Sequence, residues 1–222
     1  MRLRLPLTVS AIILSAALLV SCVPAAEVST TTSGTDVALG PEFLGSNPSP
    51  SPEATISPEA GSWEGVEPPH GYRVGLITAT SDPTADALAR GVMEWAAARD
   101  IHVEIWAADN DDEIEAAITE ASEERDIDLV IGAGRGIVDI FALITSQHLA
   151  QEFLVVGAQL PEPTHNVTAV VWPGASFRGS GISEATDAED SAATDEQALT
   201  ATGAGVASVL HGYTGIVLAL DD

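Results

Sequence analysis

Hydrophobic residues from position 72 onward gather into short runs that are separated by amphipathic stretches. Six runs are rich in Val, Ile and Leu, and several of them are almost continuously apolar. They occupy residues 72–78, 102–108, 128–134, 152–158, 167–172 and 214–220. Such runs are typical of strands that are buried on both faces of a parallel sheet. We therefore predict six strands in this part of the chain.

Four helices are predicted between these strands. The first begins at Asp82-Pro83, an N-cap residue followed by proline, and the second carries acidic residues in its first turn, 111–113, where the helix macrodipole favours them. The third spans 137–149, and the fourth begins with the capping-box pair Thr194 and Gln197.

The alternation of strands and helices predicts an α/β fold. We expect one domain over residues 71–222, built as a doubly wound, mainly parallel sheet in three layers with right-handed crossovers. Residues 173–193, between the fifth strand and the fourth helix, are rich in Gly, Ser, Ala and acidic residues. They predict an exposed, flexible acidic loop.

The N-terminus has the pattern of a secretory signal. Arg2 and Arg4 precede an apolar stretch, 12–20, that is too short to span a bilayer comfortably. Leu19-Val20-Ser21-Cys22 then resembles the lipobox of bacterial lipoproteins, in which the cysteine thiol receives a diacylglyceryl group and the chain is cut before it.

We therefore predict a lipoprotein signal peptide over 1–21 and lipidation of Cys22, with acyl chains such as palmitate. Two or more acyl chains hold a protein stably on a membrane, which indicates the extracytoplasmic face of a bacterial cell membrane. A plain signal peptide followed by an unmodified cysteine is the alternative.

Residues 22–70 lack a hydrophobic period of either 2 or 3.6. Residues 23–70 contain 8 of the 13 prolines, mixed with Ser, Thr, Glu and Gly. This composition predicts a disordered tether whose root-mean-square reach is roughly 40 Å.

Composition excludes several functions. The chain has no Lys, and its 8 Arg face 33 acidic residues, for a net charge of −25; removal of 1–21 takes two Arg and leaves −27. Nucleic-acid binding is excluded because such a surface repels phosphate, and chemistry that needs a lysine is excluded with it. Anionic lipid headgroups also repel this surface, so the lipid on Cys22 has to hold the protein at the membrane.

Polar residues and glycines follow the predicted strands at the edge where α/β sheets bind ligands. Thr80, Ser81 and Asp82 follow the first strand, and Gln159 follows the fourth. The third strand leads into the loop 132–136, in which Gly134 allows close approach of a ligand and Arg135 supplies a bidentate donor. These six residues predict a site for a small polar solute, while a tight structural turn is the alternative for the loop.

No catalytic or metal-binding constellation is visible. There is no Gly-x-Ser-x-Gly, the five His lack metal-ligand spacing, and the single Cys excludes a multi-Cys zinc site. Residues 109–112 are acidic but lack the spacing of a calcium loop and fit a helix start better. We expect no enzyme activity, no cofactor and no metal.

The chain from Tyr72 to about Leu220 resembles the N-terminal lobe of the basic membrane protein (BMP) family of ABC-transporter substrate-binding lipoproteins. The segments that carry the resemblance are 73–78, 91–95, 128–134, 153–157, 166–170, 203–210 and 214–217.

The resemblance implies one lobe of a type I periplasmic-binding-protein fold, uptake of nucleosides or similar solutes, and an ABC permease as partner. Receptors of this kind enclose their ligand between two lobes by hinge closure. A homodimer partner would supply a second wall to the pocket. The alternative is a cell-envelope lipoprotein with a structural or interaction role that has lost solute binding.

Overall fold

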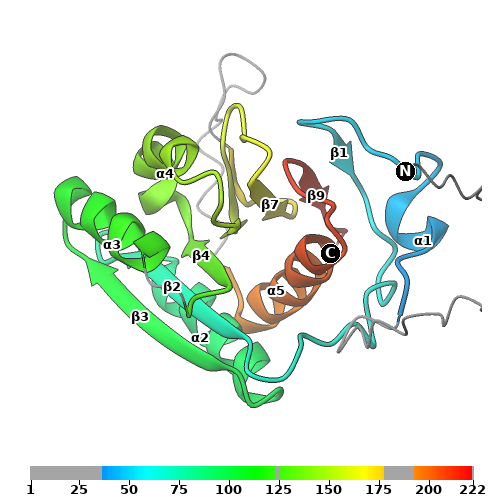
Figure 1. Cartoon of the computed structure of the whole chain (residues 1–222), viewed down its shortest axis with the longest axis horizontal. Coiled ribbons are helices and arrows are strands. Elements are labelled where there is room, and N and C mark those ends of the chain that lie inside the picture. The colour runs from blue at the N-terminus through cyan, green and yellow to red at the C-terminus, as the bar shows by residue number, and fades with distance from the viewer. Residues whose placement is uncertain (1–36, 124–125, 178–192, 222) are drawn as a thin grey trace, which may run out of the picture. The chain divides into compact units, whose positions relative to one another are not determined.

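A parallel sheet forms the centre of the protein in a computed structural model that describes residues 37–123, 126–177 and 193–221 (Figure 1). Its strands are β1 (Thr55–Ile56), β2 (Arg73–Ala79), β3 (His102–Ala108), β4 (Leu129–Ala133), β5 (Phe153–Val156), β7 (Val167–Val171) and β9 (Val217–Ala219). Their order is β1-β9-β7-β5-β4-β2-β3, and every neighbouring pair is parallel. The predicted parallel α/β fold is confirmed, and all six predicted strands are present.

The strand order reverses beside β2. Strand β3 lies on one side of β2, whereas β4 and the later strands continue on its other side. In open α/β sheets such a reversal leaves a crevice beyond the carboxyl ends of the two central strands. In this sheet the corresponding position lies between the loops that follow β2 and β4, and we call it the crevice beside β2.

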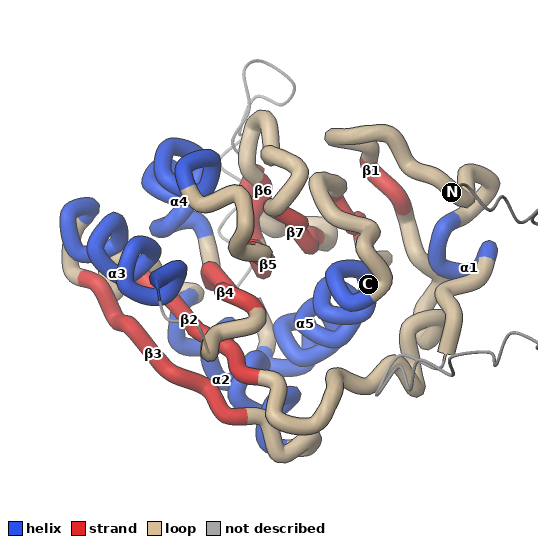
Figure 2. Tube along the Cα trace, viewed as in Figure 1, coloured by secondary structure: helices blue, strands red, loops and turns tan. Residues whose placement is uncertain are grey.

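Helices cover both faces of the sheet, as Figure 2 shows. Alternate side chains of a strand point to opposite faces, so Leu76 packs in one apolar cluster and Ile77 in the other. The first cluster includes residues of α2 (Ala85–Ala97) and α5 (Asp195–Leu210), and the second includes residues of α3 (Asp111–Glu123) and α4 (Val138–Ile144). Short 3₁₀ turns, η1 (Arg135–Ile137) and η2 (Thr145–Gln147), flank α4.

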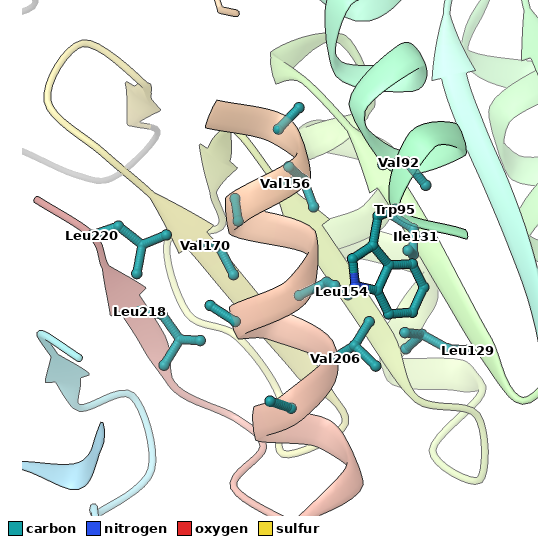
Figure 3. Close-up of a cluster of buried hydrophobic side chains, with 14 of the residues drawn as sticks. Val92, Trp95, Leu129, Ile131, Leu154, Val156, Val170, Val206, Leu218 and Leu220 are labelled. Carbon is teal, nitrogen blue, oxygen red and sulfur yellow. The ribbon is translucent and has the colours of Figure 1, made fainter. Parts of the chain in front are cut away.

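Small residues allow α2 and α5 to pack closely. A side chain at Gly91 of α2 would overlap the Ala198 methyl group and lie 2.5 Å from the Asp195 carbonyl oxygen. Close to this contact, Trp95 reaches from α2 toward Leu129 and Val206, as Figure 3 shows.

Residues 37–70, which we call the strap, pack against the α/β core. They contain α1 (Pro41–Leu44) and β1, and Phe43 is fully buried with its ring 6.3 Å from that of Trp63. Backbone hydrogen bonds attach the strap to the sheet beside β9, where the Val217 N–H donates to the Ala54 carbonyl at 2.9 Å. The prediction of a tether is therefore wrong for 37–70, because a few apolar residues without periodicity are enough to dock an irregular segment.

Two helix starts can be compared with the sequence. The capping box at Thr194 and Gln197 is confirmed. The first helix, α2, begins at Ala85 with Thr84 as its N-cap residue rather than at Asp82. The side chain of Asp82 instead turns back on its own loop and accepts hydrogen bonds from the Thr84 N–H and hydroxyl.

Several predictions concern residues outside the described ranges. They are the signal peptide 1–21, lipidation of Cys22, the first part of the tether, and most of the acidic loop 173–193. The described start of that loop forms β8 (Ser176–Phe177), which pairs with β6 (Ala158–Gln159) in a separate two-stranded sheet. Within the described ranges, no helix combines the length and apolar character needed to cross a bilayer.

Candidate functional site

The Asp82 carboxylate occupies the crevice between the ends of β2 and β4. It is buried, with 6% of its surface exposed. One oxygen accepts hydrogen bonds from the Thr84 N–H at 2.9 Å and the Thr84 hydroxyl at 2.7 Å. The other accepts from the Gly136 N–H at 3.0 Å, at the start of the helical segment after β4. An N–H in that position is where a bound anion would be held, and here the protein's own carboxylate holds it.

The glycines of the loop after β4 make this arrangement possible. Gly134 has φ +85°, and a side chain there would overlap the Asp82 carboxylate. A Cβ at Gly136 would lie 2.6 Å from the methyl group of Ala79. These close approaches explain the two glycines by packing.

The other predicted site residues have different surroundings. Thr80 donates from its hydroxyl to Asp109 at 2.6 Å, which joins the loops after β2 and β3. Ser81 and Arg135 are exposed at the same edge. Gln159 lies in β6, outside the main sheet. The fold thus brings together the residues after β2 and β4, and the role of all six residues in binding stays a prediction.

A cavity of about 340 Å³ opens farther along the carboxyl edge, where β7 and β9 end beside the first turns of α5. Trp172 and Leu220 are buried and supply apolar wall. Its lining residues are Trp172, Thr194, Glu196, Gln197, Thr200, Leu220 and Asp221. Both the volume and the mixture of an aromatic ring with a few polar groups are typical of small-molecule sites.

Gly157 helps to place the aromatic wall of this cavity. Its φ is +81°, and a Cβ there would lie 3.1 Å from both Trp172 Cη2 and Leu88 Cδ1. Gly157, which directly follows β5, therefore leaves room for the indole of Trp172 to pack at the end of β7.

Sequence reasoning pointed to this edge but missed the cavity. Trp172 was recognised only as the end of a strand, and Thr194 and Gln197 only as a capping box. Glu196, Thr200 and Asp221 carried no signal, because nothing in a sequence shows that the start of one helix lies beside the ends of two strands. The position of α5 against β7 was the missing information.

Of the two acidic residues in the first turn of α5, Asp195 pairs with an arginine and Glu196 lines the cavity. Arg90 of α2 makes two hydrogen bonds of 3.0 Å to Asp195. The hydrogen bond and positive charge of Arg90 lower the pKa of Asp195, and Asp195 in turn raises the pKa of Arg90. Asp195 is therefore matched by a cation, while the neighbouring Glu196 lines the cavity.

The perturbed acid Glu152 lies outside this site. Burial raises its pKa, one of its carboxyl oxygens is buried without a hydrogen-bond partner, and it precedes β5 at the amino end of the sheet. Burial also raises the pKa of Tyr72, and the charges of Asp128 and Glu152 add to that effect. In the part of the chain that the structure describes, no group of three or more His, Cys, Asp or Glu is placed to hold a metal ion.

No protein-family model and no curated protein sequence matches this chain. Among solved structures, an ABC transporter solute-binding protein from Aeropyrum pernix K1 is 16% identical with a TM-score of 0.41, over 46% of this chain and 28% of that one. A lipoprotein fragment from Peptoclostridium difficile 630 is 12% identical with a TM-score of 0.44, over 64% and 99%. An ABC transporter substrate-binding protein from Sphaerobacter thermophilus is 14% identical with a TM-score of 0.39, over 68% and 47%.

This chain thus spans about a quarter of the Aeropyrum protein and about half of the Sphaerobacter protein. Because all three TM-scores lie below 0.5, the fold assignment rests on the strand order and helix layers of this chain itself. The resemblance to the BMP family stays a prediction.

Proposed function

We propose that this protein is a lipid-anchored, extracytoplasmic solute-binding domain that holds a small polar molecule at the carboxyl edge of its sheet. The observation that carries the proposal is the cavity of about 340 Å³ between β7, β9 and the start of α5. Doubly wound α/β folds bind their ligands at this edge. The cavity combines a buried indole with amide, hydroxyl and carboxylate groups, which suits a solute that has both an apolar and a polar part.

Sequence features support the wider role. A lipid on Cys22 would keep the domain at the outer face of the membrane, where a solute receptor delivers its ligand to a permease. The resemblance to the BMP family favours an ABC permease as partner. A second copy of the chain in a homodimer would add a second wall to a cavity that one lobe leaves partly open.

Calorimetry with the full chain tests the proposal. Nucleosides, monosaccharides, amino acids and small amines are titrated one class at a time, and thermal unfolding is followed in parallel. A true ligand at 100 times its Kd stabilises the folded state by about 2.7 kcal/mol. Heat and a raised melting temperature with at least one class are expected.

Two matched variants locate the binding. Thr200→Phe places a ring in the cavity and should abolish the heat, whereas Thr119→Phe places the same ring on the solvent side of α3 and should leave it unchanged. Absence of heat and of thermal stabilisation with every class would overturn solute binding.

The Asp82 contact favours one second candidate, a cell-envelope lipoprotein with a structural or interaction role. The crevice beside β2 is filled by a side chain of the protein itself, as expected where solute binding has been lost. In this case a defined partner would co-purify from membranes equally well with the unchanged chain and with Thr200→Phe, and no solute would bind.

A further inference from the structure

The charges around the carboxyl edge restrict which polar solute can bind there. Two carboxylates, Glu196 and Asp221, line the cavity, and the described lining contains no Arg and no His. Trp172 contributes to one wall, and the π-face of an indole attracts cations. An anionic solute would meet like charges at this place.

Among the residues that the structure describes, the arginines that could balance these carboxylates are engaged elsewhere. Arg73 lies 3.1 Å from Asp126, and Arg99 lies 3.1 Å from Glu67. Arg90 pairs with Asp195, as described above. Arg135 is on η1, after β4, and does not line the cavity.

The crevice beside β2 is also unfavourable for an anionic ligand. Its available N–H, on Gly136, is taken by the carboxylate of Asp82 at 3.0 Å. The place where a phosphate or carboxylate ligand would dock on this fold is therefore already occupied by a negative charge.

The partial positive charge at the start of α5 would favour an anion, but the negative charges around the cavity outweigh it. A helix N-terminus carries about half an elementary charge, whereas Glu196 and Asp221 each carry a full negative charge. The capping box also uses N–H groups of the first turn, because the Gln197 N–H donates to the Thr194 hydroxyl at 3.1 Å. At long range, the net charge of −25 further concentrates cations around the protein.

We propose that the cavity binds a small organic cation, with an ammonium group near Glu196 and Asp221 and an apolar body against Trp172. This inference rests on the proposed function and names its ligand class. A cation over an indole strengthens binding roughly 2- to 30-fold, depending on how far it is desolvated. The exposed carboxylates add a weaker attraction that depends on salt.

Calorimetry with choline and 3,3-dimethylbutan-1-ol tests the proposal, because the alcohol has the same shape as choline but no charge. The full chain is used at about 20 mM and at about 150 mM salt, and putrescine serves as a second cation. Choline should bind roughly 10-fold more tightly than the alcohol, or better, and should weaken as salt rises.

Variants assign the contacts. Glu196→Gln and Asp221→Asn should each weaken choline binding about 2- to 5-fold. Trp172→Leu should weaken it about 2- to 30-fold. Glu120→Gln removes one charge from the exposed face of α3 and should leave the affinity unchanged. Since Trp172 is buried and its replacement can disturb folding, the two carboxylate variants decide the result if Trp172→Leu unfolds.

The outcomes separate this inference from the function on which it rests. If nucleosides or monosaccharides bind and Thr200→Phe abolishes their binding, while choline and putrescine give no heat, the solute-binding proposal stands and the cation inference is overturned. Binding of an anionic solute in the cavity, or choline binding that both carboxylate variants leave unchanged, also overturns it. If no solute class gives binding heat, both the solute-binding proposal and the cation inference are overturned.

Discussion

Replacing Phe43 with Ala tests whether the strap is part of the folded core. Phe43 is fully buried, its ring meets that of Trp63 edge to face at 81°, and it belongs to the apolar cluster that includes α2 and α5. A flexible tether would leave this side chain in water in both the folded and the unfolded state. A docked strap and a flexible tether therefore predict different changes in the free energy of unfolding for Phe43→Ala.

The structure sets the size of the effect. Removal of a buried Phe costs the transfer free energy of its ring and creates a cavity, which together amount to about 3–5 kcal/mol. For a domain of this size each kcal/mol corresponds to about 2–4 °C in melting temperature. Phe43→Ala should therefore lower the melting temperature by roughly 6–20 °C.

Urea unfolding of the full chain, followed by tryptophan fluorescence, measures the loss. Val37→Ala is the matched control, because Val37 lies on the same strap but is 43% exposed, and it should change the free energy of unfolding by less than about 0.5 kcal/mol. A double-mutant cycle with Trp63→Ala should return a coupling energy of about 0.5–1.5 kcal/mol for the ring pair. If Phe43→Ala unfolds at the same urea concentration as the unchanged chain, the docked strap is refuted.

Three further predictions concern glycine packing and buried acids. Gly91→Ala should destabilise the protein by about 1–3 kcal/mol, because the new Cβ meets the backbone of α5. Gly203→Ala should instead stabilise the protein by up to about 1 kcal/mol, because the new Cβ meets only side chains, at 3.4 Å or more. Equal shifts of the two variants in thermal unfolding would contradict this. Asp82→Ala leaves the partly buried Gly136 N–H without its acceptor and should cost about 1–3 kcal/mol in urea unfolding. An unchanged midpoint would show that the contact is dispensable. Burial raises the pKa of Glu152, so its charged form opposes folding at pH values above the ordinary glutamate pKa. Glu152→Gln should therefore raise the melting temperature at pH 7 but not at pH 3, where the glutamate is neutral in both states. A gain that persists at pH 3 would rule out ionisation as the cause.

The predicted elements succeeded where hydrophobic pattern and local chemistry agree. Strands β2, β4, β5 and β7 were found because they are buried on both faces, so nearly every position is apolar. Strand β3 lies at the edge of the sheet and is partly exposed, and it was found by its alternating pattern instead. The start of α5 was found because a capping box involves residues only three positions apart. Asp82 was misplaced as an N-cap because α2 begins only at Ala85, with Thr84 as its N-cap residue. The Asp82 side chain bonds Thr84 and also the Gly136 N–H, 54 positions along the chain.

The candidate site, too, was predicted only in part. The carboxyl edge was predicted because parallel strands end on the same side, and that follows from the order of elements. The cavity itself was not, because Trp172, Thr200 and Leu220 come from three separate elements.

By itself, the sequence determined the class of fold, six strands of the main sheet, and the excess of negative charge. These properties depend on composition and on the spacing of residues that are close in the chain. Only the tertiary structure decided that 37–70 is a docked strap, that Asp82 fills the crevice beside β2, and that a cavity forms beside α5. Each of these depends on surfaces that meet across long separations in the chain, where the geometry of packing, rather than any local pattern, selects the partner.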